Sequence, residues 1–89
     1  MRRAARVDNN QQEIVDALLS AGRSVFIASS IGRGFPDLVV GYDNKTYLLE
    51  VKGPKGKKTP HQDMFAAYWR GSEVYIVRTA EDAIKITGV

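Results

Sequence analysis

The stretch Gly34-Phe35-Pro36-Asp37-Leu38-Val39-Val40-Gly41, followed after a short break by Leu48-Leu49-Glu50-Val51-Lys52, decides the fold. The runs of valine and leucine in both pieces are typical of buried strands. Between them, Asp43-Asn44-Lys45 is a hairpin-type turn, so we expect the two strands to be antiparallel neighbours. Folding back about this turn brings together the two far ends of the hairpin, which carry its charged residues.

Those charged residues are Asp37, Glu50 and Lys52. Glu50 and Lys52 are two positions apart, so in a strand their side chains point to the same face. Placing an acid and a base inside apolar strands costs on the order of several kcal/mol unless the charges are paired or bound to a metal ion. The sequence therefore predicts that these charges meet at the open end of the hairpin, where they are paired with one another or bound to a metal ion.

Length and composition restrict the class of protein. With 89 residues, the chain has room for one domain, 1–89. Since it contains no cysteine, a disulfide scaffold, a thiolate zinc site and a cysteine nucleophile are excluded. It contains neither a signal peptide nor an apolar run of the roughly 20 residues that cross a membrane, so we expect a soluble, intracellular protein with no membrane partner. The net charge of +3 is compatible with a polyanionic partner.

The remaining patterns predict the element order α-β-β-β-α-β-α, an α/β mixed sheet with helices on its faces. Beside the two hairpin strands we expect a helix over 11–21, a strand over 24–29, a helix from a Thr59 cap through Trp69, a strand over 73–78, and a last short helix capped by Thr79. Gly32 and Gly34 allow the loop before the hairpin to approach another surface.

Two helix starts show capping signals. Thr59-Pro60-His61-Gln62 combines a threonine N-cap, a proline at the first helical position and a glutamine that closes a capping box. Asp8-Asn9-Asn10 offers several N-caps for the first helix, and Asp8 has capping-box spacing to Gln11. Residues 1–7 are basic and expected to be frayed; Arg2, Arg3 and Arg6 are either solvated or in contact with phosphates.

Asp37, Glu50 and Lys52 are the residue types that metal-assisted phosphodiester hydrolysis needs. Two carboxylates, with the backbone carbonyl of Val51 as a further oxygen ligand, would hold Mg²⁺ and leave positions open for water and a phosphate oxygen. The Lys52 ammonium could orient that water or stabilise the charge that develops on the phosphate.

The motifs resemble those of the PD-(D/E)XK nuclease superfamily, and more closely those of its VRR-NUC branch. A lone D…ExK pattern is short and common, whereas its combination with a proline, apolar flanks and the helix start is far more specific. The resemblance extends over nearly the whole chain and implies a restriction-endonuclease-like fold. The segments that match are Gly34-Phe35-Pro36-Asp37-Leu38, Leu49-Glu50-Val51-Lys52-Gly53 and Thr59-Pro60-His61-Gln62, with Glu13 as the upstream acid.

By this resemblance, Asp37 and Glu50 are metal ligands, Lys52 is the catalytic lysine, and Glu13 and Gln62 support the site. The small stand-alone members of the family, known from phages and bacteria, are similar to junction-resolving enzymes and work as dimers. The resemblance thus implies a Mg²⁺-dependent DNA endonuclease, with Mn²⁺ able to substitute, in the cytoplasm of a bacterial or phage-infected cell. The expected substrate is a four-way (Holliday) junction cut by a homodimer, since its two opposed strands need paired cuts.

Simpler interpretations stand beside these. Asp37 could be a turn residue after Pro36, and Glu50 with Lys52 a same-face pair on a half-exposed strand. Glu13 could be an ordinary solvated helix residue, and Gln62 caps its helix in either case.

Several residues outside the charged cluster are candidates for DNA contact. His61 is expected on the surface, with a DNA contact as the alternative. Tyr68 and Trp69 could stack on unpaired bases, but their helical spacing from Phe65 favours the core or a dimer face. Four basic residues could hold phosphates or could simply be solvated: Arg33, Lys55, Lys57 and Lys58.

Three alternatives to a junction resolvase remain open. One is a nuclease for flaps, splayed arms or single strands that uses the same site. Another is a nucleic-acid-binding module that does not cut, although such a module would be expected to have lost one of the three charged residues. The third is a structural domain in which these charges form a buried ion network.

Overall fold

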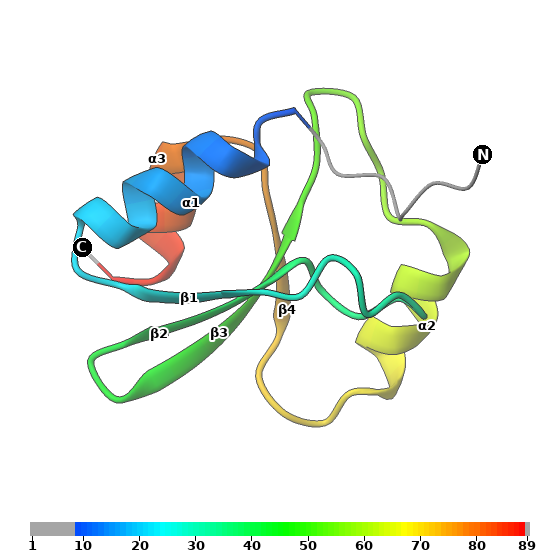
Figure 1. Ribbon diagram of the computed structural model, residues 1–89. Helices are drawn as coiled ribbons and strands as arrows, with labels where there is room; N and C mark the ends of the chain where they lie inside the picture. Colours follow the sequence, from blue (N-terminus) through cyan, green and yellow to red (C-terminus); the bar gives the residue numbers. More distant parts are fainter. Residues whose placement is uncertain (1–8, 89) are drawn as a thin grey trace.

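A four-stranded mixed sheet and three helices form residues 9–88, the part of the chain that the computed structural model describes (Figure 1). The elements are α1 (Gln11–Ser20), β1 (Ser24–Ile27), β2 (Leu38–Tyr42), β3 (Lys45–Val51), α2 (Pro60–Tyr68), β4 (Val74–Val77) and α3 (Ala80–Ile86). Their order, α-β-β-β-α-β-α, and the α/β class confirm the prediction from the sequence. The predictions for Arg2, Arg3, Arg6 and Asp8 lie outside the described residues.

The sheet order β1-β2-β3-β4 follows the chain. β2 and β3 are antiparallel, with Leu38 opposite Leu49, which confirms the predicted hairpin. Its turn consists of Asp43 and Asn44, both with positive φ, at 53° and 63°. Two positive φ values in succession are characteristic of the type I′ turn, whose twist matches that of the strands it joins. Lys45, expected in the turn, is instead the first residue of β3.

β4 makes the sheet mixed because it pairs with β3 in parallel, while β1 pairs with β2 antiparallel. A parallel pair cannot be joined by a tight turn and needs a crossover connection. The crossover here contains α2, which lies at the far end of the molecule from α1 and α3 (Figure 1). The segment between β1 and β2 reaches the same region, so α2 and this loop are neighbours.

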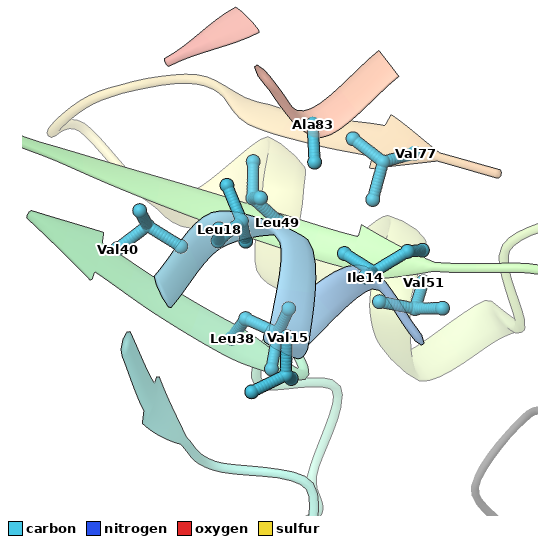
Figure 2. Packing of buried hydrophobic residues seen from close by; sticks show 9 residues of the cluster. All are labelled: Ile14, Val15, Leu18, Leu38, Val40, Leu49, Val51, Val77 and Ala83. Atoms are coloured by element: carbon cyan, nitrogen blue, oxygen red, sulfur yellow. The ribbon is translucent and has the colours of Figure 1, made fainter. Parts of the chain in front are cut away.

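The hydrophobic core lies between the sheet and the pair α1 and α3 (Figure 2). Successive strand side chains point to opposite faces, so the alternate residues of β2 and β3 that face α1 are apolar. Glu50 lies between two of these core residues and therefore points to the opposite face of the sheet. The buried cluster consists of Ile14, Val15, Leu18, Leu38, Val40, Leu49, Val51, Val77 and Ala83.

Several boundaries differ from the sequence prediction. β1 ends at Ile27, two residues early, and β2 begins one residue after Asp37. α2 ends at Tyr68, and Trp69 already has an extended backbone with φ −69° and ψ 127°. The interpretation of Tyr68 and Trp69 as core residues is wrong, because they are 76% and 42% exposed.

The capping predictions hold for two of three helices. Thr59 with Gln62 and Thr79 with Asp82 each form a reciprocal capping box at the start of α2 and α3. At α1 the N-cap is Asn10, but its side chain makes no capping hydrogen bond. Within residues 9–88, every helix is too short or too polar to cross a membrane.

Candidate active site

The open end of the hairpin holds Asp37 in a fixed place. The Val51 N–H donates to Asp37 Oδ2 at 2.8 Å, and the Asp37 carbonyl accepts from the Ala28 N–H at 2.7 Å. Asp37 is thus tied on one side to the end of β3 and on the other to the segment after β1. This position confirms that the hairpin brings Asp37 to the end of β3 that carries Glu50 and Lys52.

Glu50 is buried, with only 1% of its surface exposed. Its Oε2 accepts a hydrogen bond from Gln62 Nε2 and lies 3.7 Å from Lys52 Nζ. Its Oε1 is also buried but has no hydrogen-bond partner within residues 9–88. A buried acceptor without a partner is costly and rare in folded proteins. Among residues 9–88 only Asn10 Oδ1 shares this state, and Glu50 Oε1 is the one carboxylate oxygen in it.

Gln62 joins α2 to the charged cluster. While its Nε2 donates to Glu50, its Oε1 accepts from Lys52 Nζ at 2.8 Å and from the Thr59 N–H at 2.8 Å. One amide therefore closes the capping box of α2 and also sets the position of both charged side chains. The structure brings Gln62 into contact with Glu50 and Lys52, as the resemblance implied, and its role in a reaction stays a prediction.

The environment of Glu50 changes its acidity. Burial away from water, followed by the negative charge of Asp37, raises the pKa of Glu50 from 4.5 to about 7. The Lys52 charge and the hydrogen bonds from Gln62 and Lys52 act in the opposite direction but do not offset the rise. Burial thus outweighs the attraction of Lys52, and the proton is held more tightly on Glu50 than on a solvated carboxyl.

The backbone carbonyl of Val51 opens toward the same place. The N–H and C=O of one strand residue point to the same side, and consecutive residues alternate between sides. The Val51 N–H points to Asp37, whereas the next N–H, that of Lys52, donates to the Val77 carbonyl of β4 at 3.0 Å. The Val51 carbonyl therefore faces Asp37, which is the direction its predicted role as a metal ligand requires.

Glu13 is not brought to this cluster. It is exposed on the first turn of α1, a helix that covers the face of the sheet opposite to Glu50. Within residues 9–88, no third acid or histidine joins Asp37 and Glu50 in a group of metal-ligand spacing. The structure thus places Glu13 as its simpler interpretation expects, and its role in a reaction stays a prediction.

The basic candidates lie on exposed loops around α2. Lys55 and Lys57 are exposed in the loop after β3, and Lys58 is half-buried there. Arg33 is exposed in the loop before β2 with a positive φ of 58°. His61 is on the surface, as predicted. Contact of any of these residues with DNA stays a prediction.

Two residues that position the site were missed or misassigned from the sequence. Asn10 Nδ2 donates to the carbonyls of Lys52 and Arg78 at 3.1 and 2.8 Å, so it joins α1 to the ends of β3 and β4. Arg78 Nη1 donates to the carbonyls of Gly53 and Gly56 and shapes the basic loop. These contacts span distant parts of the chain and leave no local signal; only Asn10 was a candidate, and then as a helix cap.

Gly34 fixes where α2 sits. Its φ is +83°, and a Cβ at this position would lie 2.2 Å from the His61 carbonyl oxygen. The loop before β2 therefore packs directly on the first turn of α2, which confirms the predicted close approach for Gly34. At Gly32, also with positive φ, a Cβ would meet no atom within 4 Å.

No family model matches this chain, and no curated protein is significantly similar to it. The likeness to the VRR-NUC branch therefore depends on the motifs quoted above.

Proposed function

We propose that this protein is a metal-dependent DNA endonuclease of the VRR-NUC type, which hydrolyses phosphodiester bonds in branched DNA as a homodimer. The observation that carries the proposal is the convergence of Asp37, Glu50 and Lys52 at the hairpin end around a buried carboxylate oxygen with no partner within residues 9–88. In a purely structural ion network, each buried oxygen is expected to accept a hydrogen bond from the protein. An oxygen that binds a metal ion needs no such donor.

The donor set suits Mg²⁺. Glu50 Oε1, the Asp37 carboxylate and the Val51 carbonyl are all oxygen donors, which Mg²⁺ prefers, and Mn²⁺ accepts the same set. Burial, and after it the negative charge of Asp37, raises the pKa of Glu50, so the metal-free site disfavours the carboxylate form that a cation would bind. A divalent cation held by these three residues would give Glu50 Oε1 a partner and would stabilise its carboxylate form.

The chemistry that a bound Mg²⁺ supplies is polarisation of the phosphate and a lower pKa for a coordinated water. The protein's own residues position the reacting groups and stabilise charge. Lys52 Nζ, held by Gln62 Oε1 at 2.8 Å, places an ammonium beside Glu50, where it can stabilise charge that develops on the phosphate or orient the attacking water. The Val51 N–H holds the Asp37 carboxylate in one orientation.

The DNA would reach this site beside α2. Arg33, Lys55, Lys57 and Lys58 lie on the two loops that flank its first turn and can hold phosphates, while contributing no base specificity. A four-way junction is the first substrate to test, since its symmetry matches that of a homodimer.

The test is cleavage of a labelled panel with Mg²⁺ or EDTA: four-way junction, flap, splayed arm, plain duplex and single strand. We expect metal-dependent cutting that Lys52→Ala lowers by about 100-fold or more, as for other residues that stabilise transition-state charge. The matched control is Lys45→Ala, because Lys45 is exposed at the opposite end of β3, roughly 20 Å away.

Each outcome selects one class of protein. Symmetric nicks in the junction support the dimeric resolvase, and cutting confined to flaps or single strands keeps the chemistry but replaces the substrate. Salt-sensitive DNA binding without any cutting would reassign the protein to a binding module. If neither DNA binding nor a Mg²⁺-dependent change in melting temperature is found, the charges are structural.

A further inference from the structure

Three aromatic side chains form a row that ends in a partly exposed tryptophan. Phe35 packs edge-to-face on Phe65, with centroids 5.4 Å apart and planes at 68°. Phe65 in turn stacks on Trp69 at 5.3 Å and 18°, close to parallel. Both arrangements are favoured for aromatic pairs. Phe65 covers one face of the indole, while Trp69 stays 42% exposed, so part of the ring is open to a ligand.

The backbone holds the indole in this place. Trp69 follows the last residue of α2, and its N–H still donates to the Phe65 carbonyl at 2.9 Å. Gly71 then lies against the edge of the ring, where a Cβ would be 2.6 Å from the indole Nε1. Any side chain at position 71 would displace the ring. The indole is therefore presented to solvent by the turn after α2.

A hollow of about 300 Å³ lies beside this ring, lined by Tyr68, Trp69, Arg70 and Gly71. Its volume is at the lower end of the range for small-molecule sites, roughly 300–1,000 Å³. Tyr68 is 76% exposed, and Arg70 is exposed next to the two aromatic residues. The hollow thus combines flat apolar surfaces with one permanent positive charge.

We propose that Trp69 and Tyr68 bind an unpaired nucleobase, with Arg70 on an adjacent phosphate. The inference rests on the proposed function, because it takes DNA as the ligand. A base would extend the near-parallel stack of Phe65 and Trp69 by one ring, and every base has a face for such stacking. The guanidinium at the edge of the hollow favours an anionic ligand over the apolar side chain of a protein partner.

The position relative to the charged cluster defines the substrate further. Gln62, which contacts Glu50, lies in the first turn of α2, and Trp69 directly follows the last turn, so the two are roughly 10 Å apart along the helix axis. One DNA strand advances about 3.4 Å per nucleotide when stacked. The base on Trp69 is therefore about three nucleotides from the phosphate at the charged cluster. This geometry favours flaps, splayed arms and opened junction centres over plain duplex.

Trp69 is the single tryptophan of the chain, so its fluorescence reports on this site alone. The full protein is titrated in EDTA with a thymine oligonucleotide, a splayed arm and a blunt duplex of equal length. We expect saturable quenching by the first two, and little change with the duplex at the same concentration. Binding is followed in parallel by the anisotropy of labelled DNA.

Variants separate stacking from general attraction. By anisotropy, Trp69→Leu should weaken single-strand binding by about tenfold or more, whereas Trp69→Phe should keep most of it. Arg70→Ala should weaken binding severalfold and lower its salt dependence. The control is Lys85→Ala, an exposed lysine on α3 that should change neither. Melting curves identify any variant that fails to fold.

DNA that binds without quenching, or equal quenching by the duplex, would overturn the stacking site and leave the nuclease proposal standing. Quenching without any metal-dependent cleavage in the panel would keep the stacking site and overturn the nuclease proposal. A shift in Trp69 emission that grows with protein concentration in the absence of DNA, together with a doubled mass, would assign the hollow to a second copy of the chain and overturn the inference.

Discussion

Glu50 should make the metal-free protein less stable as pH rises, which is opposite to the effect of a carboxyl whose pKa is lowered on folding. Since its pKa is raised from 4.5 to about 7, the folded state holds the proton more tightly than the unfolded state between these values. The contribution of Glu50 to the free energy of unfolding therefore falls as pH rises from about 4.5 to about 7, by on the order of 3 kcal/mol. In EDTA we expect a higher melting temperature at pH 5 than at pH 7.5.

The matched control for this effect is Glu50→Gln, which keeps the shape but does not titrate. The groups that face Glu50 are Asp37, Lys52 and Gln62. Asp82 does not confuse the measurement: hydrogen bonding from the Arg78 N–H lowers its pKa below 3.8, so its contribution is lost only at more acidic pH. A pH slope that is unchanged in Glu50→Gln would show that another group is responsible.

Metal binding should act against this proton. Mg²⁺ needs the carboxylate form of Glu50, so we expect millimolar Mg²⁺ to raise the melting temperature, and to raise it more at pH 8 than at pH 6. Asp37→Asn and Glu50→Gln should each abolish the shift. Asp43→Asn, in the exposed hairpin turn, and Glu13→Gln, on the exposed face of α1, should leave it intact. A shift that survives loss of Asp37 would place the metal elsewhere.

At the scale of elements, the position of α2 depends on the loop that packs against it. Gly34→Ala introduces a Cβ within 2.2 Å of the His61 carbonyl oxygen in addition to an unfavourable positive φ. We expect this change to move the first turn of α2, separate Gln62 from Glu50, and lower both the melting temperature and cleavage. Gly32→Ala is the control, because it carries the same φ penalty of about 1 kcal/mol with no clash.

The comparison of these two variants is informative in both directions. If Gly32→Ala and Gly34→Ala lose stability and activity equally, the loss is due to backbone strain alone. A selective loss of cleavage in Gly34→Ala, with most of the stability retained, would assign the contact of loop and helix to the assembly of the site.

At the scale of the whole molecule, the predicted homodimer has a direct measurement. We expect light scattering to give a mass of about twice 9.9 kDa at micromolar concentration, or on addition of a four-way junction. A small domain buries a modest share of its surface, and paired cuts need two sites. A strict monomer both free and on DNA would contradict the prediction and favour flaps or splayed arms as substrates.

Local signals predicted the parts of this fold that local contacts determine. The turn at Asp43 and Asn44 and the capping box of Thr59 and Gln62 depend on residues within four positions of one another, so sequence alone shows them. The hairpin then carries Asp37 to Glu50 without further information. The convergence of the charged cluster was therefore predictable.

Contacts across the chain were not predictable in the same way. Asn10 was assigned as a helix cap, but its side-chain amide donates instead to two carbonyls at the ends of distant strands. Arg23 is buried, donates to Thr87 Oγ1 at 3.0 Å and lies 3.8 Å from the ring centre of Tyr42, although nothing near it in the sequence suggests a buried arginine. Trp69 continues the apolar spacing of the helix, but its backbone is already extended, and nothing near it in the sequence other than Gly71 indicates that the helix ends at Tyr68.

The side-chain amide of Gln62 makes the backbone N–H of Thr59 a reporter of ligand binding at the charged cluster. The Thr59 N–H donates to the same Gln62 oxygen that accepts from Lys52. The backbone amide proton of Thr59 can exchange with deuterium only after the Gln62 oxygen moves away. Any ligand that draws Gln62 from Glu50 and Lys52 should therefore change the exchange rate of one backbone proton at the start of α2, a readout that needs no label, no substrate turnover and no mutation.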